Sequence, residues 1–313
     1  MEGPKKFLPT VVIVVCLLLA GGVLYRFVQQ VAEAVEPAAS AGAQATPALH
    51  AAAKAGDLAE LRRLLGSGGD PDRPLEQAAE ARRGMTALMA AAEAGRAEVC
   101  RELLGAGARA NATTAHKWTA LMYAAGWGGA ETVRAVLEGD PAVNARGRDD
   151  WTALHFAAAR GAAESLDLLL TAGADLSIEN RWGQNALMLA AGSGNLAKVE
   201  RLLQTDARRR VDQADREGQT ALHQATDAGG EGLKIMRALL EAGGSADPAD
   251  RRGVTPLMRA CVGGDIERVR LLLERGADPE RVDESGLSPA DWARTRDDER
   301  VAPILAALAG ENP

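Results

Sequence analysis

Residues 152–175 read TALHFAAARGAAESLDLLLTAGAD, and this stretch decides the fold because its pattern returns along most of the chain. The leucines that align with its third residue are Leu49, Leu88, Leu121, Leu154, Leu187, Leu222 and Leu257, most of them 33 to 35 residues apart, and Ala290 closes the series. An alanine follows each of these leucines by three residues and a glycine follows by seven. Self-similarity at such a period predicts a stack of repeats.

Each repeat reads as two short helices joined by a turn. In every repeat after the first, a Thr, Asn or Ser lies two residues before the aligned residue, where its side-chain oxygen can cap the first helix. The alanines allow neighbouring first helices to approach closely, and the glycine, as in Gly161, is expected to end the first helix with a positive φ. Apolar pairs such as Leu169-Leu170 then fill the space beside the second helix. Because both sides of such a unit are apolar, the units must stack.

The pattern resembles the ankyrin repeat family. Its T-P-L-H-x-A motif is matched at 152–157, 220–225 and 255–260, and its G-A-D loop at 173–175 and 276–278. The resemblance implies an all-α solenoid over residues 46–310, with about eight helix-turn-helix repeats, hairpin loops between them and degenerate repeats as caps. It also implies local hydrogen-bond networks for the motif histidines His50, His155 and His223. We expect the extra residues at 206–210 to form a hairpin or loop extension.

Composition limits the classes of function. The 313 residues carry 43 acidic and 36 basic side chains, a net charge of -7, which argues against nucleic acid as a partner. Aromatic residues make up only 3% of the chain, so we expect a core of Ala, Leu and Val.

The amino terminus predicts one transmembrane helix over residues 7–28. Residues 7–25 are uncharged, and as a helix they would span about 28 Å, close to the thickness of a bilayer core. A short segment, 1–6, precedes the helix, and an Ala/Pro/Gly-rich tether, 29–45, follows it. A cleaved secretory signal is the alternative, since 32–34 and 43–45 fit small-x-small cleavage sites. Lipid attachment at Cys16 is disfavoured because Val15 precedes it.

The charges beside this helix predict its orientation. Lys5 and Lys6 precede the uncharged run 7–25 and Arg26 is the only base close behind it, so the positive-inside rule leaves the amino terminus in the cytoplasm and the repeats outside. We expect a bacterial inner-membrane protein with repeats facing the periplasm, or a secreted or periplasmic protein if the segment is cleaved.

No enzyme, cofactor or metal site is predicted. Residues 105–110, GAGARA, fit a dinucleotide fingerprint but follow a helix instead of a strand. The three motif histidines occupy the same slot in different layers, too far apart to share a metal ion. Cys100 and Cys261 are five repeats apart and are expected to be buried apolar packing.

Tryptophan and arginine mark the predicted binding surface. In the ankyrin family, the hairpin tips and the residues after the alanine pair face the concave surface and vary with the partner. The residues predicted to bind a protein there are Trp118, Trp127, Trp151, Trp182, Arg148, Arg160, Arg181 and Arg216. The alternative is that some of these rings brace neighbouring hairpins.

These features together predict a membrane-tethered module that binds an unidentified partner protein on its concave surface, as a scaffold, adaptor or inhibitor. The competing function is an accessory protein that holds a small molecule in a Trp-lined groove and supports a redox or other enzyme.

Overall fold

The computed structural model describes residues 46–75, 82–296 and 298–311, and these residues form a row of helix pairs without any β-strand. The predicted transmembrane helix, 7–28, and the tether, 29–45, lie outside the described residues. Within the described ranges, no helix is both long enough and apolar enough to cross a membrane.

Each pair consists of a first and a second helix. The first helices are residues 46–55, α3 (Ala87–Glu93), α5 (Ala120–Tyr123), α7 (Ala153–Ala159), α9 (Ala186–Gly192), α11 (Ala221–Asp227), α13 (Pro256–Gly263) and α15 (Pro289–Arg294). The second helices are α2 (Leu58–Gly66), α4 (Ala97–Gly105), α6 (Ala130–Leu137), α8 (Ala163–Thr171), α10 (Leu196–Leu203), α12 (Gly232–Glu241), α14 (Ile266–Glu274) and α16 (Val301–Leu308). The all-α repeat architecture is therefore the one predicted from the sequence.

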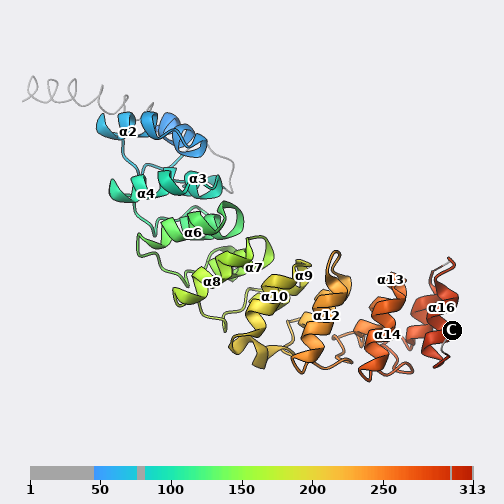
Figure 1. Cartoon of the computed structure of the whole chain (residues 1–313). Coiled ribbons are helices and arrows are strands. Elements are labelled where there is room, and N and C mark those ends of the chain that lie inside the picture. Colours follow the sequence, from blue (N-terminus) through green and yellow to red (C-terminus); the bar gives the residue numbers. More distant parts are fainter. Residues whose placement is uncertain (1–45, 76–81, 297, 312–313) are drawn as a thin grey trace, which may run out of the picture.

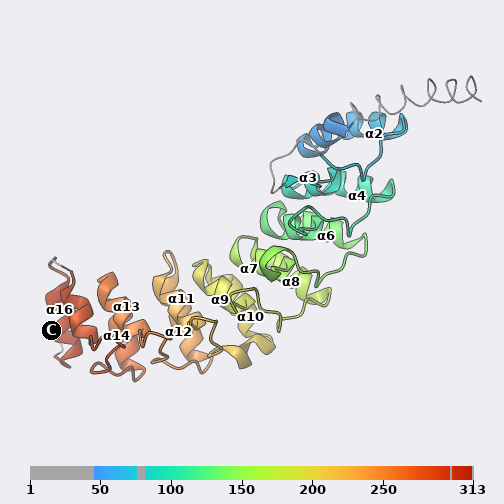
Figure 2. The same ribbon diagram turned by 180° about the vertical axis from the view of Figure 1, so that it is seen from behind.

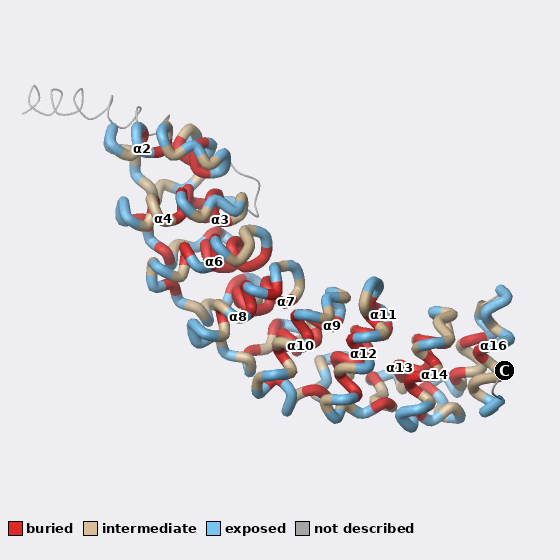
Figure 3. The backbone as a smooth tube through the Cα atoms, in the orientation of Figure 1, coloured by how far each residue is buried: buried red, intermediate tan, exposed pale blue. Residues whose placement is uncertain are grey.

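The pairs stack in two layers. First helices pack against first helices of the next pair, as α7 does on α9, and second helices pack against second helices, as α8 does on α10. The stack curves, and the first helices lie along its concave side (Figures 1 and 2). Buried backbone runs through the inside of both layers from one end to the other (Figure 3).

Side-chain caps begin the first helices, as the sequence predicted. The hydroxyl of Thr152 accepts a hydrogen bond from the backbone N–H of His155, three residues on, and Asn185 caps α9 in the same way from Met188 at 3.0 Å. The same cap is made by Thr86, Thr119, Thr255 and Ser288. Each cap satisfies an N–H group that the helix itself leaves free.

The core consists of the predicted alanines and the first member of each apolar pair. Ala125, Ala158 and Ala191 are fully buried between adjacent first helices. Leu169 and Leu202 are fully buried on the second helices, and the second member of each pair is partly exposed except for Leu240, which is also buried. Small side chains let the first helices approach closely, and the leucines fill the wider space between the layers.

The glycine expectation was correct for only part of the array. Gly95, Gly194 and Gly264 adopt positive φ, between 69° and 72°, and end the turn as predicted. Gly161 does not, so its expected positive φ was wrong. A Cβ atom at Gly161 would lie 2.0 Å from the carbonyl oxygen of Ala125 in the preceding repeat. Glycine is therefore required at this position because two backbones approach there.

Hairpin tips join the repeats edge to edge. In each hairpin the first tip residue donates its backbone N–H to a carbonyl of the preceding hairpin: Ala115 to Arg83, Arg148 to His116, Arg181 to Asp149, Arg216 to Trp182, Arg251 to Glu217 and Glu284 to Arg252, all at 2.7–2.9 Å. This bonded row runs along the stack. The extra residues at 206–210 form a short 3-10 helix, η4 (Asp206–Arg210), where a hairpin or loop extension was expected.

Basic side chains also connect consecutive repeats by capping helix C-termini. Lys198 of α10 is buried and donates from Nζ to the carbonyl oxygen of Ala158 at 3.0 Å, at the end of α7. Arg268 of α14 donates to Ala228 at 2.7 Å after α11. A cation is favoured at these ends because the last carbonyls of a helix lack internal partners and carry partial negative charge.

Candidate functional site

Five aromatic side chains form one cluster across the third and fourth repeats. Trp118, Tyr123, Trp127, Trp151 and Phe156 make up this aromatic cluster. The Phe156 ring lies 4.9 Å from Trp151, 5.0 Å from Trp118 and 5.5 Å from Trp127, measured between centroids. Trp118 and Trp127 stack at 6.1 Å with an interplanar angle of 30°. The structure thus brings together three of the four predicted tryptophans.

The sequence interpretation missed Tyr123 and Phe156. Both are buried and lie two residues after the aligned leucine, beneath the tryptophans. Burial raises the pKa of Tyr123 to about 12, so its hydroxyl stays protonated. In other repeats this slot holds Ala90, Leu189, Gln224 or Arg259. Reading the slot across repeats would have shown large rings only at Tyr123 and Phe156, in the repeats that carry Trp118 and Trp151, and at Trp292 in the last repeat.

Exposure differs within the predicted site. Trp127 and Trp182 are 43% and 47% exposed, whereas Trp118 and Trp151 are half-buried. The guanidinium carbon of Arg160 lies 5.7 Å from the Trp127 ring centroid, a cation–π contact. Trp182 belongs to the next hairpin, and no ring contact joins it to the cluster among the described residues.

Trp127 lies in an irregular turn. α5 continues into a π-helical turn, η2 (Ala124–Gly128), in place of the tight turn that ends other first helices. The positive φ then falls on Gly129, at 80°, one residue later than that of Gly95 in the preceding repeat. Single π-helical turns are uncommon and concentrate at functional sites. Here the turn presents the Trp127 ring beside Arg160.

The two hairpins beside the cluster hold residues in the left-handed conformation. The fourth residue before the aligned leucine is a glycine of positive φ in five repeats, namely Gly84, Gly183, Gly218, Gly253 and Gly286. In the cluster's repeats it is Lys117, at φ 58°, and Asp150, at φ 60°. Residues other than glycine, asparagine and aspartate rarely adopt this conformation, and it costs free energy for residues that have a Cβ atom. Backbone strain therefore lies beside the aromatic cluster.

The predicted arginines lie at the hairpin tips, apart from Arg160. Arg148 contacts the Nε2 atom of His116 at 3.0 Å, and Arg181 pairs with Asp149 at 3.1 Å. Arg216 is exposed on the following tip. A groove of about 420 Å³ runs beside Trp151 and Arg160 and is bounded by Met188, Leu189 and Gln224 of α9 and α11. The concave side thus combines rings, guanidinium groups and one groove.

Comparison with known proteins identifies the family to which this repeat architecture belongs. The sequence profile described as "Ankyrin repeats (3 copies)" matches successive overlapping stretches, 24–114, 49–147, 106–180, 154–248, 187–283 and 228–312. The chain belongs to the ankyrin repeat family. The ankyrin repeats of this chain are similar to part of human "Ankyrin repeat domain-containing protein 63", 42% identical over 60 residues, which are 19% of this chain and 16% of that protein.

A second ankyrin match is to mouse "SH3 and multiple ankyrin repeat domains protein 1", 44% identical over 77 residues, or 24% of this chain and 4% of that protein. A third is Caenorhabditis elegans "Ankyrin repeat and KH domain-containing protein mask-1", 39% identical over 70 residues, or 22% of this chain and 3% of that protein. These matches cover less than a fifth of each relative. They therefore show a shared ankyrin repeat region and say nothing about the other parts of the relatives.

The ankyrin motif histidines are structural in this chain. His155 accepts the backbone N–H of Thr152 at Nδ1, so its Nε2 atom carries the proton and donates to the carbonyl oxygen of Gln184 in the next repeat at 3.3 Å. His223 bridges Thr220 and Val254 in the same way. Burial lowers the pKa of His155 to about 4 and also lowers that of His223. Both imidazoles stay neutral at physiological pH.

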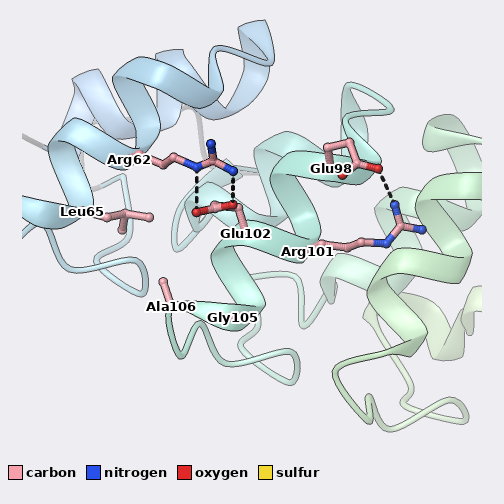
Figure 4. Close-up of a pocket in the computed structure, with 7 residues that line it drawn as sticks. All are labelled: Arg62, Leu65, Glu98, Arg101, Glu102, Gly105 and Ala106. Atoms are coloured by element: carbon pink, nitrogen blue, oxygen red, sulfur yellow. Dashed lines mark hydrogen bonds and ion pairs between the residues drawn. The ribbon is translucent and has the colours of Figure 1, made fainter.

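The outer face of the ankyrin stack carries paired charges. A pocket of about 490 Å³ between α2 and α4 is lined by Arg62, Glu98, Arg101 and Glu102, and the Arg62–Glu102 pair spans two repeats at 2.9 Å (Figure 4). Gly105, which begins the GAGARA run, ends α4 in this pocket, so no strand precedes the run. Because these arginines are already paired with glutamates, the pocket has no free positive charge to bind an anion or a nucleotide.

The remaining reactive groups do not assemble. Cys100 and Cys261 are both buried, unlinked and packed in separate repeats, and burial raises the pKa of each thiol to about 12. Within the described parts of the chain, no group of three or more His, Cys, Asp or Glu side chains could hold a metal ion.

Proposed function

We propose that this chain is a membrane-tethered interaction module that binds a partner protein through the aromatic cluster and the neighbouring arginines. The observation that carries the proposal is the exposure of Trp127 and Trp182. They are two of only four large apolar side chains exposed among the described residues. Tryptophan and arginine are the residue types most enriched where binding energy concentrates.

The deciding experiment tests whether the tryptophan rings bind the partner or only stabilise neighbouring hairpins. Trp182→Ala, made in the full-length chain, should leave the melting temperature within about 2 °C, because its exposed ring makes no ring contact among the described residues. Trp127→Ala should lower it by a few degrees, since its ring packs on Trp118 and Phe156. Each should weaken capture of the partner from native membranes about thirtyfold, the usual effect of truncating a central tryptophan.

Val282→Ala and Leu287→Ala are the matched controls. Their side chains are 54% and 42% exposed but lie in the last repeats, away from the proposed site. If the tryptophan variants melt early and the folded fraction still captures the partner, the rings are braces and the proposal fails.

The tether is part of the same proposal. It rests on the uncharged run 7–25, with Lys5 and Lys6 before it. We propose that residues 7–28 stay in the bacterial inner membrane and that the repeats face the periplasm. A reporter active only in the periplasm, fused after Gln44, should be active. A reporter active only in the cytoplasm would reverse the orientation, and a mature amino terminus near residue 35 or 46 would replace the anchor with a cleaved signal.

A small-molecule function is the second candidate, favoured by the groove beside Trp151. Its lining combines the apolar side chains Trp151, Met188 and Leu189 with the polar side chains Arg160, Gln184, Ser193 and Gln224, and ligand pockets are built in this way. An absorption band or a ligand retained through purification would support this candidate.

A further inference from the structure

The hairpin tips carry a regular row of positive charge. Arg148, Arg181, Arg216 and Arg251 occupy the same slot in four consecutive repeats, and all four are exposed; we call them the arginine row. Each donates its backbone N–H to the preceding hairpin, which fixes the four tips in one line. The row is notable because the whole chain has a net charge of -7.

Half of the arginine row lacks an internal counter-charge. Arg148 and Arg181 contact His116 and Asp149, whereas Arg216 and Arg251 make no side-chain ion pair with any residue that the structure describes. The neighbouring tip positions add Arg82, Arg83, Lys117 and Arg252 against Asp149, Asp150, Glu217 and Glu284. An exposed guanidinium without a partner in the fold is available to an anionic ligand.

The spacing of the row selects a geometry for that ligand. Packed helices are separated by about 8–10 Å, so consecutive tips are separated by a similar distance. In a polyproline II helix, residues three apart lie on the same side and are about 9.3 Å apart. In a β-strand, residues three apart point to opposite faces. A polyproline II segment with a carboxylate at every third residue therefore matches the row.

Trp182 adds an apolar contact in the middle of the row. It lies next to Arg181, its carbonyl accepts the N–H of Arg216, and its side chain is 47% exposed. Aromatic surfaces are what polyproline II segments bind in other recognition domains. We infer that the arginine row and Trp182 bind an acidic, proline-rich segment of the partner protein in the polyproline II conformation. This inference rests on the proposed interaction function and specifies the chemistry of the partner.

The test uses synthetic peptides and the full-length chain. The probe is a blocked peptide of four Glu-Pro-Pro units, and its control has the same composition with the four glutamates together. Calorimetric titration at low salt should give at least about fivefold tighter binding for the spaced peptide, because only its carboxylates match the row one to one. Equal binding of the two peptides, or no binding of either, overturns the inference.

Variants locate the binding on the protein. Arg216→Glu with Arg251→Glu should weaken the spaced peptide about tenfold or more, since two attractions become repulsions. The matched control is Arg209→Glu with Arg237→Glu, which makes the same charge change at two exposed sites on η4 and α12 and should change affinity less than about twofold. Trp182→Ala should also weaken binding. Equal loss in both double variants means nonspecific charge attraction and overturns the site.

Two further outcomes distinguish the alternatives. If a short single-stranded oligonucleotide binds more tightly than the peptide with the same dependence on Arg216 and Arg251, the row is a nucleic-acid site and the inference is wrong. If partner capture depends on Trp127 while neither peptide binds, the interaction function stands and only the inferred chemistry of the partner fails.

Discussion

At the scale of single residues, the strain beside the aromatic cluster predicts gains in stability. Lys117→Gly and Asp150→Gly should each raise the free energy of unfolding by about 1 kcal/mol, because glycine adopts the positive φ found there without steric cost. Chemical denaturation measures the change. Gly286→Ala is the reciprocal control, since this glycine has a φ of 78° and no atom near its absent Cβ, and it should destabilise by a similar amount. Unchanged midpoints in all three would mean that these tips relax without strain.

The buried imidazole of His155 predicts a dependence of stability on pH. In the unfolded chain the pKa of histidine is about 6.5, and burial lowers the pKa of His155 in the fold to about 4. Between these values the unfolded chain binds a proton that the folded chain does not. The contribution of His155 to stability is therefore complete above pH 6.5 and falls by up to about 3 kcal/mol as the pH drops towards 4.

His155→Met removes the imidazole but leaves every carboxylate in place, so comparing the two proteins isolates the effect of His155. Methionine should fit the site because Met122 and Met188 fill the same slot in adjacent repeats. Denaturation midpoints of both proteins are measured from pH 7.5 to pH 4. The difference between them should change across that window. A difference that stays constant would show that the folded protein accepts the proton freely.

At the scale of helices, the close approach between η2 and the turn that follows α7 predicts which glycines tolerate a side chain. Gly161→Ala places a methyl group against the carbonyl oxygen of Ala125 and should destabilise by about 2–3 kcal/mol, since the clash is with backbone. Gly173 has positive φ but open space around it, so Gly173→Ala should cost only about 1 kcal/mol. Denaturant titration of the two variants compares the cost of a steric clash at Gly161 with the cost of a positive φ at Gly173. A larger loss for Gly173→Ala than for Gly161→Ala would show that α7 shifts to accept the methyl group.

The sequence predicted the elements well and their irregularities poorly. The repeating Leu, Ala and Gly positions predicted the helix pairs, and the Thr slot predicted the caps, because these depend on interactions within one repeat. Gly128 occupies the same slot as Gly95, yet the chain around it forms a π-helical turn. The turn packs against Phe156 of the next repeat, and the spacing of the aligned residues does not encode such a contact.

The site was predicted in part for the same reason. The tryptophans stand out by number in a chain with 3% aromatic residues. Their division into exposed rings, such as Trp127, and half-buried rings, such as Trp151, arises from contacts between repeats. The hairpin slot that lacks glycine at Lys117 and Asp150 was visible in the sequence and would have indicated strain beside the cluster.

At the scale of the whole molecule, the aromatic cluster determines what an optical experiment can observe. Of the seven Phe, Tyr and Trp side chains in the described residues, five lie in the cluster and Trp182 is in the adjacent hairpin. Intrinsic fluorescence therefore reports mainly on the middle of the array, whereas far-ultraviolet circular dichroism averages over every helix. The two signals become independent probes of one molecule.

Ile304→Ala, a fully buried truncation in α16, should lower the dichroism midpoint while shifting the fluorescence midpoint less, since stability in a repeat array spreads through neighbouring interfaces. Identical shifts would mean that all repeats unfold together. If the two midpoints shift by different amounts, the difference between the shifts measures how far a disturbance at one end of the stack reaches towards the proposed binding surface.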